Sequence, residues 1–221
     1  MGSRRFAAYS IIASAIVIMI ATSVTGQAAD VIVKRTLSTR DVRTEESPLA
    51  SVVADAIRAA GKAEIGLIAA TSFTDATIPE GSAKPEDFVR SLMFKSDTVV
   101  VMRLTGAQVK TALEHGLGML PARSAAFLQV SGIRIRANPT AQRGSRVDSI
   151  QVGKAALDPS RTYTVAMPSP LAGGALVYSK AWSRTDMDRD TGTTLEDALK
   201  AFLATTKEIG NATEERIVLG R

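Results

Sequence analysis

The chain has 221 residues, no cysteine and a formal net charge of +5, from 27 Lys and Arg against 22 Asp and Glu. Without cysteine a disulfide-held scaffold is excluded, so a chain of this length must be held together by a hydrophobic core, which can form a single domain. Its basic residues form no cluster interleaved with aromatic residues, which argues against a nucleic-acid partner.

Residues 1–28 have the three parts of a secretory signal peptide. Arg4 and Arg5 precede an apolar run over 6–24, and the small residues Gly26 and Ala28 follow it. We expect cleavage after Ala28, which removes two basic residues and leaves 25 Lys and Arg against 22 Asp and Glu, a net charge of +3. Residues 29–221 would then form one periplasmic or secreted domain.

The alternative is that this segment stays attached as an N-terminal anchor. Its densest apolar stretch, 11–21, is shorter than the roughly 20 residues that a spanning helix needs, although 6–24 comes close. On this alternative the domain would be held at a membrane, and on both alternatives it would lie outside the cytoplasm. No other segment of the sequence is apolar enough to span a bilayer.

Short apolar or alternating runs indicate strands, and apolar residues at helical spacing indicate helices. In chain order these patterns predict a strand at 31–33, a helix at 48–61, a strand at 64–70, a loop at 71–84, one or two helical turns at 85–92, a strand at 97–104, a helix at 105–117, strands at 127–137, 147–152 and 162–167, a glycine turn at 171–177, a helix at 193–203 and a strand at 215–218. The mixture lacks regular βαβ alternation, which favours an α+β fold over a doubly wound parallel sheet.

Capping signals support three of the predicted helices, and Gly61 is expected to end the first of them. The signals at the helix starts are Ser47 before Pro48, Thr105 with Gln108, and Thr193 with Glu196.

Several blocks of the sequence occur in the order typical of a known family. The most characteristic are LTGAQVK at 104–110, ALEHG at 112–116 and FLQVSGIR at 127–134. Further blocks lie at 43–49, 54–58, 65–70, 93–94, 163–166, 171–174 and 215–217. Together they resemble the C-terminal, substrate-binding domain of the 5'-nucleotidase family. The resemblance implies a four-layer α/β/β/α sandwich, and these 221 residues contain no counterpart of the family's metal-bearing phosphoesterase domain.

The resemblance also implies where a nucleotide would bind. In the family the ligand is held by an opening arginine, an Asn and an Arg of one loop, two aromatic rings around the base, and an Asp in a glycine turn. Arg43 and Phe94 match this pattern. The sequence departs from it at Ala69 for the Asn, Thr74 for the Arg, Ser96 for an Asn or Gly, Pro170 for a ring and Ala175 for the Asp.

These departures predict a degenerate nucleotide site. A hydrogen bond to a charged group contributes roughly 1.5–3 kcal/mol, and about 1.4 kcal/mol corresponds to tenfold in affinity. Losing several such contacts would weaken a micromolar site beyond the millimolar range. We therefore expect that the domain does not bind nucleotides in the family's usual way.

The chain offers little chemistry for catalysis. It has one histidine, His115, and no cysteine, so a two-metal phosphoesterase centre is very improbable. His115 is interpreted as a surface or capping residue. We expect no catalytic residue, no metal site and no cofactor.

Two charged groups of residues have alternative interpretations. The acidic run at 186–190 alternates like a calcium loop but lacks the Gly and Glu of the EF-hand pattern, so a solvated loop is favoured, with Tyr178 and Trp182 packed beneath it. The second group could be a basic stripe for an acidic partner or a solvated strand face. It consists of Arg134, Arg136, Arg143 and Arg146.

The expected function is that of an exported, non-catalytic domain, related by family to nucleotide catabolism, that binds a small ligand or a protein partner. The alternative is an accessory substrate-binding subunit that completes a phosphoesterase in trans with a separately encoded metallophosphoesterase domain. In that case Arg43 would face the phosphates and Phe94 would stack on the base. A purely structural envelope protein is a third possibility.

Overall fold

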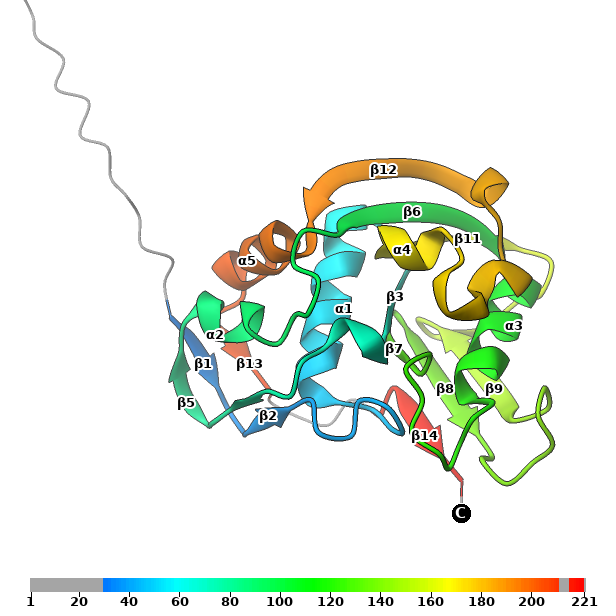
Figure 1. Cartoon of the computed structure of the whole chain (residues 1–221), viewed down its shortest axis with the longest axis horizontal. Helices are drawn as coiled ribbons and strands as arrows, with labels where there is room; N and C mark the ends of the chain where they lie inside the picture. The colour runs from blue at the N-terminus through cyan, green and yellow to red at the C-terminus, as the bar shows by residue number, and fades with distance from the viewer. Residues whose placement is uncertain (1–29, 211–214, 221) are drawn as a thin grey trace, which may run out of the picture.

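The computed structural model describes residues 30–210 and 215–220, and its five-stranded mixed sheet extends from β12 and β6 at the upper edge of Figure 1 to β3 and β7 near the centre. Its strand order is β12-β6-β11-β3-β7; β11 and β3 are parallel and the other pairs antiparallel. Its strands are β3 (Ile65–Ala69), β6 (Thr98–Thr105), β7 (Leu128–Ser131), β11 (Thr162–Pro168) and β12 (Met187–Thr194). The valine-rich strand β6 lies inside this sheet, and Val99, Val100 and Val101 are all buried.

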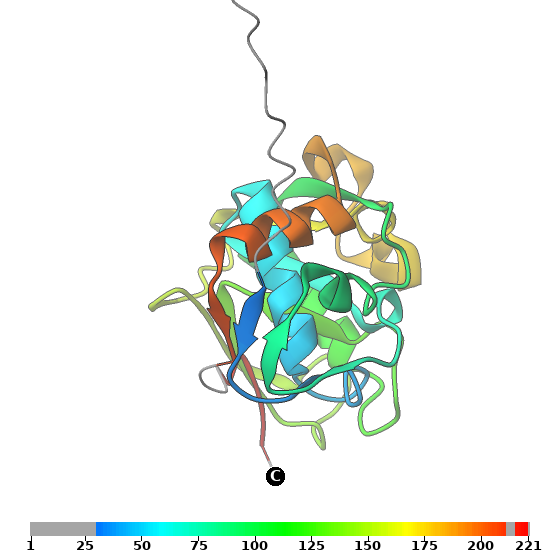
Figure 2. The same cartoon turned by 90° about the vertical axis from the view of Figure 1, so that its left-hand side faces the viewer.

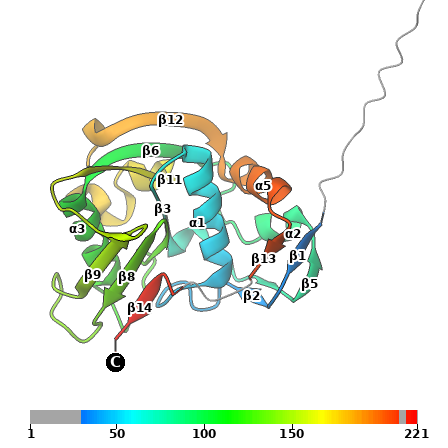
Figure 3. The same ribbon diagram turned by 180° about the vertical axis from the view of Figure 1, so that it is seen from behind.

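A second sheet has the order β10-β9-β8-β14 and lies beside the C-terminal end of the chain (Figure 3). It consists of β8 (Ile133–Ala137), β9 (Val147–Val152), β10 (Ala155–Ala156) and β14 (Ile217–Leu219). The alternation expected for β8 is present, because Ile133 and Ile135 are buried whereas Arg134 and Arg136 are exposed.

The single strand predicted over 127–137 is wrong, because Gly132 divides it between the two sheets. Gly132 has φ +77°, and a Cβ there would lie 2.1 Å from the carbonyl oxygen of Glu64. Only glycine tolerates both that backbone conformation and that close approach. The chain therefore turns at this point, so β7 joins the first sheet and β8 the second.

Two small sheets include the strand predicted at 31–33, which is confirmed, and two strands within 71–84, where the sequence predicted a loop. The order β13-β1-β5 joins β1 (Val31–Val33), β5 (Gly81–Ala83) and β13 (Glu208–Ile209), and β2 (Leu37–Ser38) pairs with β4 (Thr77–Ile78). The strands of this region are two or three residues long, so their side chains give almost no periodic signal.

Helices cover both faces of the large sheet. The helices are α1 (Pro48–Gly61), α2 (Pro85–Val89), α3 (Gly106–Leu117), α4 (Ser169–Ala172) and α5 (Leu195–Thr205). Helix α1 contacts β3, β7 and β11 and packs beside α5 (Figure 2), whereas α4 lies toward the viewer in Figure 1 and contacts β6 and β11. Helix α3 contacts β6 and β7 of the large sheet and β9 of the second sheet, so it joins the two sheets.

The helix ends agree with the sequence in part. The Ser47 hydroxyl accepts a hydrogen bond from the Ala50 amide, and Thr105 and Gln108 form the expected capping box. The predicted end of the first helix at Gly61 is confirmed, and Lys62, which follows it, adopts the left-handed conformation at φ 47°.

The expected capping box of Thr193 and Glu196 is wrong. Thr194 caps α5 by accepting a hydrogen bond from the Asp197 amide.

The acidic run at 186–190 is not a loop. It forms the end of a short 3-10 turn, η3 (Arg184–Asp186), and the start of the edge strand β12, which pairs with β6. Most of its side chains are exposed, so the sequence shows no alternation of apolar and polar residues that would predict a strand. Tyr178 and Trp182 are buried as expected, with stacked rings 5.0 Å apart.

The predicted signal segment or anchor, 1–28, lies outside the described residues. Within the described ranges, 30–210 and 215–220, no helix combines the length and apolar character needed to cross a membrane.

A candidate ligand cleft beside the glycine turn

A cleft of about 350 Å³ opens where three connections meet. These are the 3-10 turn η1 (Ala70–Ser72) after β3, the loop before β6, and the segment from the end of β11 through α4 into the 3-10 turn η2 (Ala175–Lys180). Its described lining residues are Ala69, Thr71, Ser72, Phe94, Asp97, Pro168, Pro170, Leu171, Ala175 and Leu176. Most of these are apolar, and no Lys, Arg or His is among them.

The loop before β6 presents an aromatic ring to the cleft. The Met93 amide donates a hydrogen bond to the Ser72 carbonyl over 2.9 Å, which fixes this loop against η1. Phe94 is 47% exposed and Met93 52% exposed, an unusual degree of exposure for two large apolar side chains in sequence. The ring of Phe94 is therefore available to a ligand in the cleft.

The opposite side of the cleft is built from strained backbone. Leu176 and Val177 have φ values of 56° and 69°, a region that residues other than glycine rarely adopt and that is least favourable for a β-branched residue. Such strain persists only where surrounding contacts hold it, and it gathers at functional sites. The two residues follow Gly174, which has φ +88°.

Contacts from α3 and from the end of η2 hold this strained segment in place. The Nε2 atom of His115 donates a hydrogen bond to the Leu176 carbonyl over 2.7 Å, and the Tyr178 hydroxyl donates to the Ala126 carbonyl over 2.5 Å. The His115 ring meets the Tyr178 ring edge-on at 4.8 Å. The indole N–H of Trp182 donates to the Leu171 carbonyl over 3.0 Å.

The expectation of a surface or capping His115 is therefore wrong. The half-buried ring supports the strained wall of the cleft from behind.

Three polar side chains line the cleft. Ser72 is only 6% exposed, Thr71 and Asp97 are half-buried, and none of the three side chains makes a hydrogen bond or ion pair within the described part of the chain. Burial raises the pKa of the Asp97 carboxyl above its ordinary value, because desolvation disfavours the charged form. The cleft thus combines apolar walls with a carboxylate that has no partner among the described residues.

The structure brings together four of the seven positions at which the sequence suggested family contacts. Phe94, Ala69, Pro170 and Ala175 all line the cleft. Arg43, Thr74 and Ser96 are not among its lining residues. The Arg43 carbonyl accepts a hydrogen bond from the Ser124 amide, the Thr74 hydroxyl donates one to the Arg90 carbonyl, and Ser96 is exposed.

Sequence reasoning missed Asp97, Ser72 and Thr71. Asp97 stands at the start of a valine run, where a polar residue reads as an ordinary strand end. The one available signal was its place three residues after Phe94, on the same connection.

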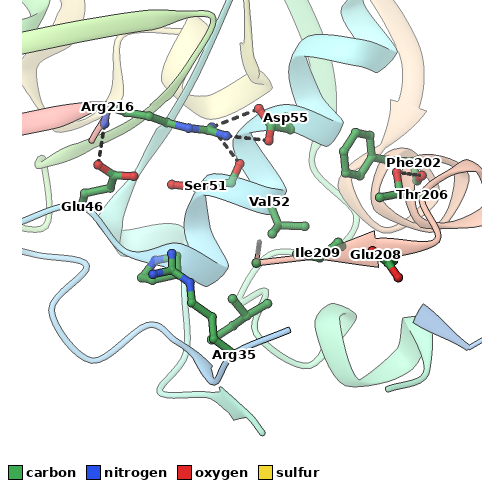
Figure 4. A pocket seen from close by; sticks show the side chains of 13 residues that line it. Arg35, Glu46, Ser51, Val52, Asp55, Phe202, Thr206, Glu208, Ile209 and Arg216 are labelled. Carbon is green, nitrogen blue, oxygen red and sulfur yellow. Dashed lines mark hydrogen bonds and ion pairs between the residues drawn. The ribbon is translucent and has the colours of Figure 1, made fainter. Parts of the chain in front are cut away.

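A second cavity, of about 330 Å³, lies between α1, α5 and β13 (Figure 4). It contains a bidentate ion pair in which the Arg216 guanidinium contacts the Asp55 carboxylate over 2.7 and 3.0 Å. The Glu46 carboxylate accepts hydrogen bonds from the amides of Arg216 and Ile217, and the Ser131 hydroxyl donates to Asp55. These groups tie β14 to α1, so their charges serve the fold.

The remaining candidate groups form no site in the described residues. No three His, Asp or Glu side chains in the described ranges are placed to hold a metal ion. The four arginines that could have formed a basic stripe do not share one face, because Arg146 is buried and donates to the carbonyls of Leu117 and Leu120, and Arg143 donates to that of Gly118. Arg134 and Arg136 are exposed on β8.

Two proteins of known name are similar to this chain in sequence. The chain is 29% identical over 184 residues to the trifunctional nucleotide phosphoesterase protein YfkN of Bacillus subtilis (strain 168), covering 80% of this chain and 12% of that protein. It is 29% identical over 151 residues to the apyrase of Aedes albopictus, covering 64% of this chain and 26% of that protein. The chain therefore spans only a minor part of the length of each of these relatives.

Solved structures agree with the fold described above. The 5'-nucleotidase precursor from Thermus thermophilus superposes with a TM-score of 0.76 at 27% identity, over 87% of this chain and 39% of that one. The NAD nucleotidase NadN of Haemophilus influenzae has the same fold, with a TM-score of 0.72 at 18% identity over 88% of this chain and 39% of that one.

The α+β fold expected from the sequence is confirmed by these superpositions. The family model described as "5'-nucleotidase, C-terminal domain" matches residues 21–181, nearly three quarters of the chain. This protein belongs to the 5'-nucleotidase C-terminal domain family, which is related to nucleotide metabolism.

Proposed function

We propose that this chain is an exported, non-catalytic ligand-binding domain whose cleft takes a ligand other than a nucleotide. The observation that carries the proposal is the chemistry of the cleft. The fold is that of the family, but the described residues that line the cleft include no basic side chain.

Phosphate recognition depends on positive or hydrogen-bond-donating groups, above all on Arg. Here the positions suggested by the family are occupied by Ala69, Pro170 and Ala175, which offer no charged or hydrogen-bonding side chain. Asp97 adds a negative charge in the same cleft, and like charges repel more strongly where water is partly excluded. A nucleotide would therefore lose favourable contacts and gain an unfavourable one.

The lack of catalysis is proposed from the inventory of side chains. The chain has one histidine and no cysteine, and His115 donates its hydrogen bond to a backbone carbonyl. Two metal ions need several His, Asp and Asn ligands held together, and the described residues contain no such group.

The proposal of export has its support in the sequence of the N-terminal segment. N-terminal sequencing of protein recovered from outside the cytoplasm should begin at residue 29.

A thermal-shift screen tests the proposed specificity. A ligand at 100 times its dissociation constant adds about 2.7 kcal/mol to folding stability. AMP, adenosine and a sugar nucleotide at millimolar concentration are expected to leave the melting temperature unchanged. A clear upward shift with AMP that disappears in Phe94→Ala would refute the proposal and restore nucleotide binding in this cleft.

An accessory subunit that acts in trans is the second candidate. It is favoured by the exposed apolar side chains that flank the cleft, Met93, Phe94 and Val177, which are 52%, 47% and 53% exposed. A separately encoded metallophosphoesterase domain could cover them. Phosphate release from AMP by that domain, measured with and without this chain, decides between the candidates: a stimulation that Phe94→Ala abolishes favours the accessory role.

A further inference from the structure

The chemistry of the cleft also indicates what kind of ligand would fit. It holds one carboxylate, on Asp97, and two hydroxyls, on Ser72 and Thr71, that have no partners within the described residues. Buried polar groups are normally hydrogen-bonded, and those left open in a concave site are the ones that a ligand or water satisfies. The Ser72 residue is 6% exposed as a whole, but its hydroxyl is not among the fully buried unpaired atoms and so remains accessible from the cleft.

We infer that this cleft binds a small organic cation, in which an ammonium or amidinium group is attached to an apolar body. The inference rests on the proposed function, because it assumes that the cleft still binds a ligand. It goes further by naming the charge and the shape of that ligand.

The positive charge of the proposed ligand is inferred from the charges of the residues that line the cleft. Burial raises the pKa of Asp97, which means that the ionised carboxylate lacks the solvation and the partners that would stabilise it. Lys95, the basic residue next to Phe94 in the chain, is exposed and does not line the cleft. A ligand cation would supply the missing partner, whereas an anion would be repelled.

The apolar part of the proposed ligand is inferred from the apolar residues that line the cleft. Pro168, Pro170, Leu171 and Leu176 give the cleft an aliphatic surface, and the exposed ring of Phe94 can stack on a flat group or contact a cation through its face. A volume of about 350 Å³ lies within the range of roughly 300–1,000 Å³ that small-molecule pockets occupy. The strained Leu176 is held by His115, so this wall is formed before any ligand arrives.

The fluorescence of a single tryptophan can be used to detect a ligand in the cleft. Trp182 is the only tryptophan, and its indole N–H donates to the carbonyl of Leu171, which lines the cleft. Its fluorescence should respond when a ligand packs against Leu171.

The test uses three probes with one apolar body and different head groups: 2-phenylethylamine, 2-phenylethanol and phenylacetate. Titrations of the purified protein followed by Trp182 fluorescence are expected to give the order amine, alcohol, acid. Because one charge-assisted hydrogen bond separates the amine from the alcohol, the amine should bind about ten- to a hundredfold more tightly.

Two variants locate the effect. Asp97→Asn should remove most of the preference for the amine and leave the alcohol titration in place. Asp148→Asn removes one acidic charge from the exposed face of β9, in the other sheet, and should preserve the preference.

The outcomes separate this inference from the proposed function. Equal binding of amine and alcohol, or a preference that survives Asp97→Asn, would overturn the cation inference while leaving a ligand cleft. Tighter binding of phenylacetate would overturn the cation inference while leaving a cleft for a ligand other than a nucleotide, whereas tighter binding of AMP, included as a fourth probe, would overturn both. Failure of all probes to change the fluorescence or the melting temperature would overturn the cation inference, whereas the absence of an effect with AMP is what the proposed function expects.

Discussion

The cavity beside α1 and the cleft beside α4 have similar volumes, about 330 and 350 Å³, but they differ in whether their carboxylates have partners. In the first, Asp55 and Arg216 pair with each other and Glu46 accepts two backbone amides. In the second, Asp97 faces apolar walls without a partner among the described residues. Paired charge in a cavity belongs to the fold, whereas a carboxylate left open in an apolar cleft points to a ligand.

The largest expected effect comes from breaking the ion pair. Arg216 has a side chain only 6% exposed, so Asp55→Ala would leave a buried charge with its main partner removed. Removing one member of a buried pair typically costs about 3–5 kcal/mol. Urea unfolding should show a loss of this size.

The control is the exposed i,i+4 pair of Lys200 and Glu196, whose side chains are 40% and 36% exposed. Lys200→Ala should cost about 0.5 kcal/mol or less. If Asp55→Ala cost no more stability than this control, the conclusion that the cavity beside α1 serves the fold would be wrong.

A smaller effect is expected from loosening the strained wall of the cleft. His115→Ala removes the hydrogen bond to the Leu176 carbonyl and the edge contact with Tyr178. These two contacts together contribute about 1–2 kcal/mol of folding stability. The variant should also change the fluorescence of Trp182 and weaken binding of the amine probe.

A purely structural role for His115 would lower stability without altering binding. Titration of the amine at a temperature well below the melting transition of the variant separates the two results.

The smallest effect concerns Asp97 itself and has the opposite sign. The pKa of Asp97 is raised in the folded state, so the folded protein binds this proton more tightly than the unfolded chain does. Stability then falls as pH rises through the range from the ordinary value of 3.8 up to the folded pKa. Asp97→Asn should be slightly more stable than the parent at about pH 7, and the difference should shrink toward about pH 3.

Urea midpoints of parent and variant across this pH range provide the measurement. A variant less stable than the parent at neutral pH would mean that Asp97 has a favourable partner and would remove the contrast between the two cavities.

Much of the fold was predictable because its signals are local. The cap of α1 at Ser47 and the box of Thr105 and Gln108 depend on neighbours within four residues, and both are present in the structure. The division at Gly132 was not predictable, because its cause is the carbonyl oxygen of Glu64, which approaches from a distant segment. The strand β12 escaped prediction because its exposed polar side chains carry no alternation.

The candidate site was predictable only in outline. The positions of Phe94, Pro170 and Ala175 could be located from the order of sequence blocks, and the structure gathers them in one cleft. The lack of a partner for the Asp97 carboxylate could not be predicted, because it depends on all the residues that surround this side chain in the folded structure. The role of His115 likewise depends on a carbonyl from a segment far along the chain.

The tie between β14 and α1 has a consequence for synthesis. Strand β14 pairs in parallel with β8, and Arg216 completes the pair with Asp55. A growing polypeptide that has not yet reached residue 216 leaves one edge of β8 uncovered and Asp55 without its cation. These contacts cannot form until residue 216 has left the ribosome, and contacts between residues far apart in the chain slow folding. That delay would favour the proposed export, because a translocation channel takes an unfolded substrate.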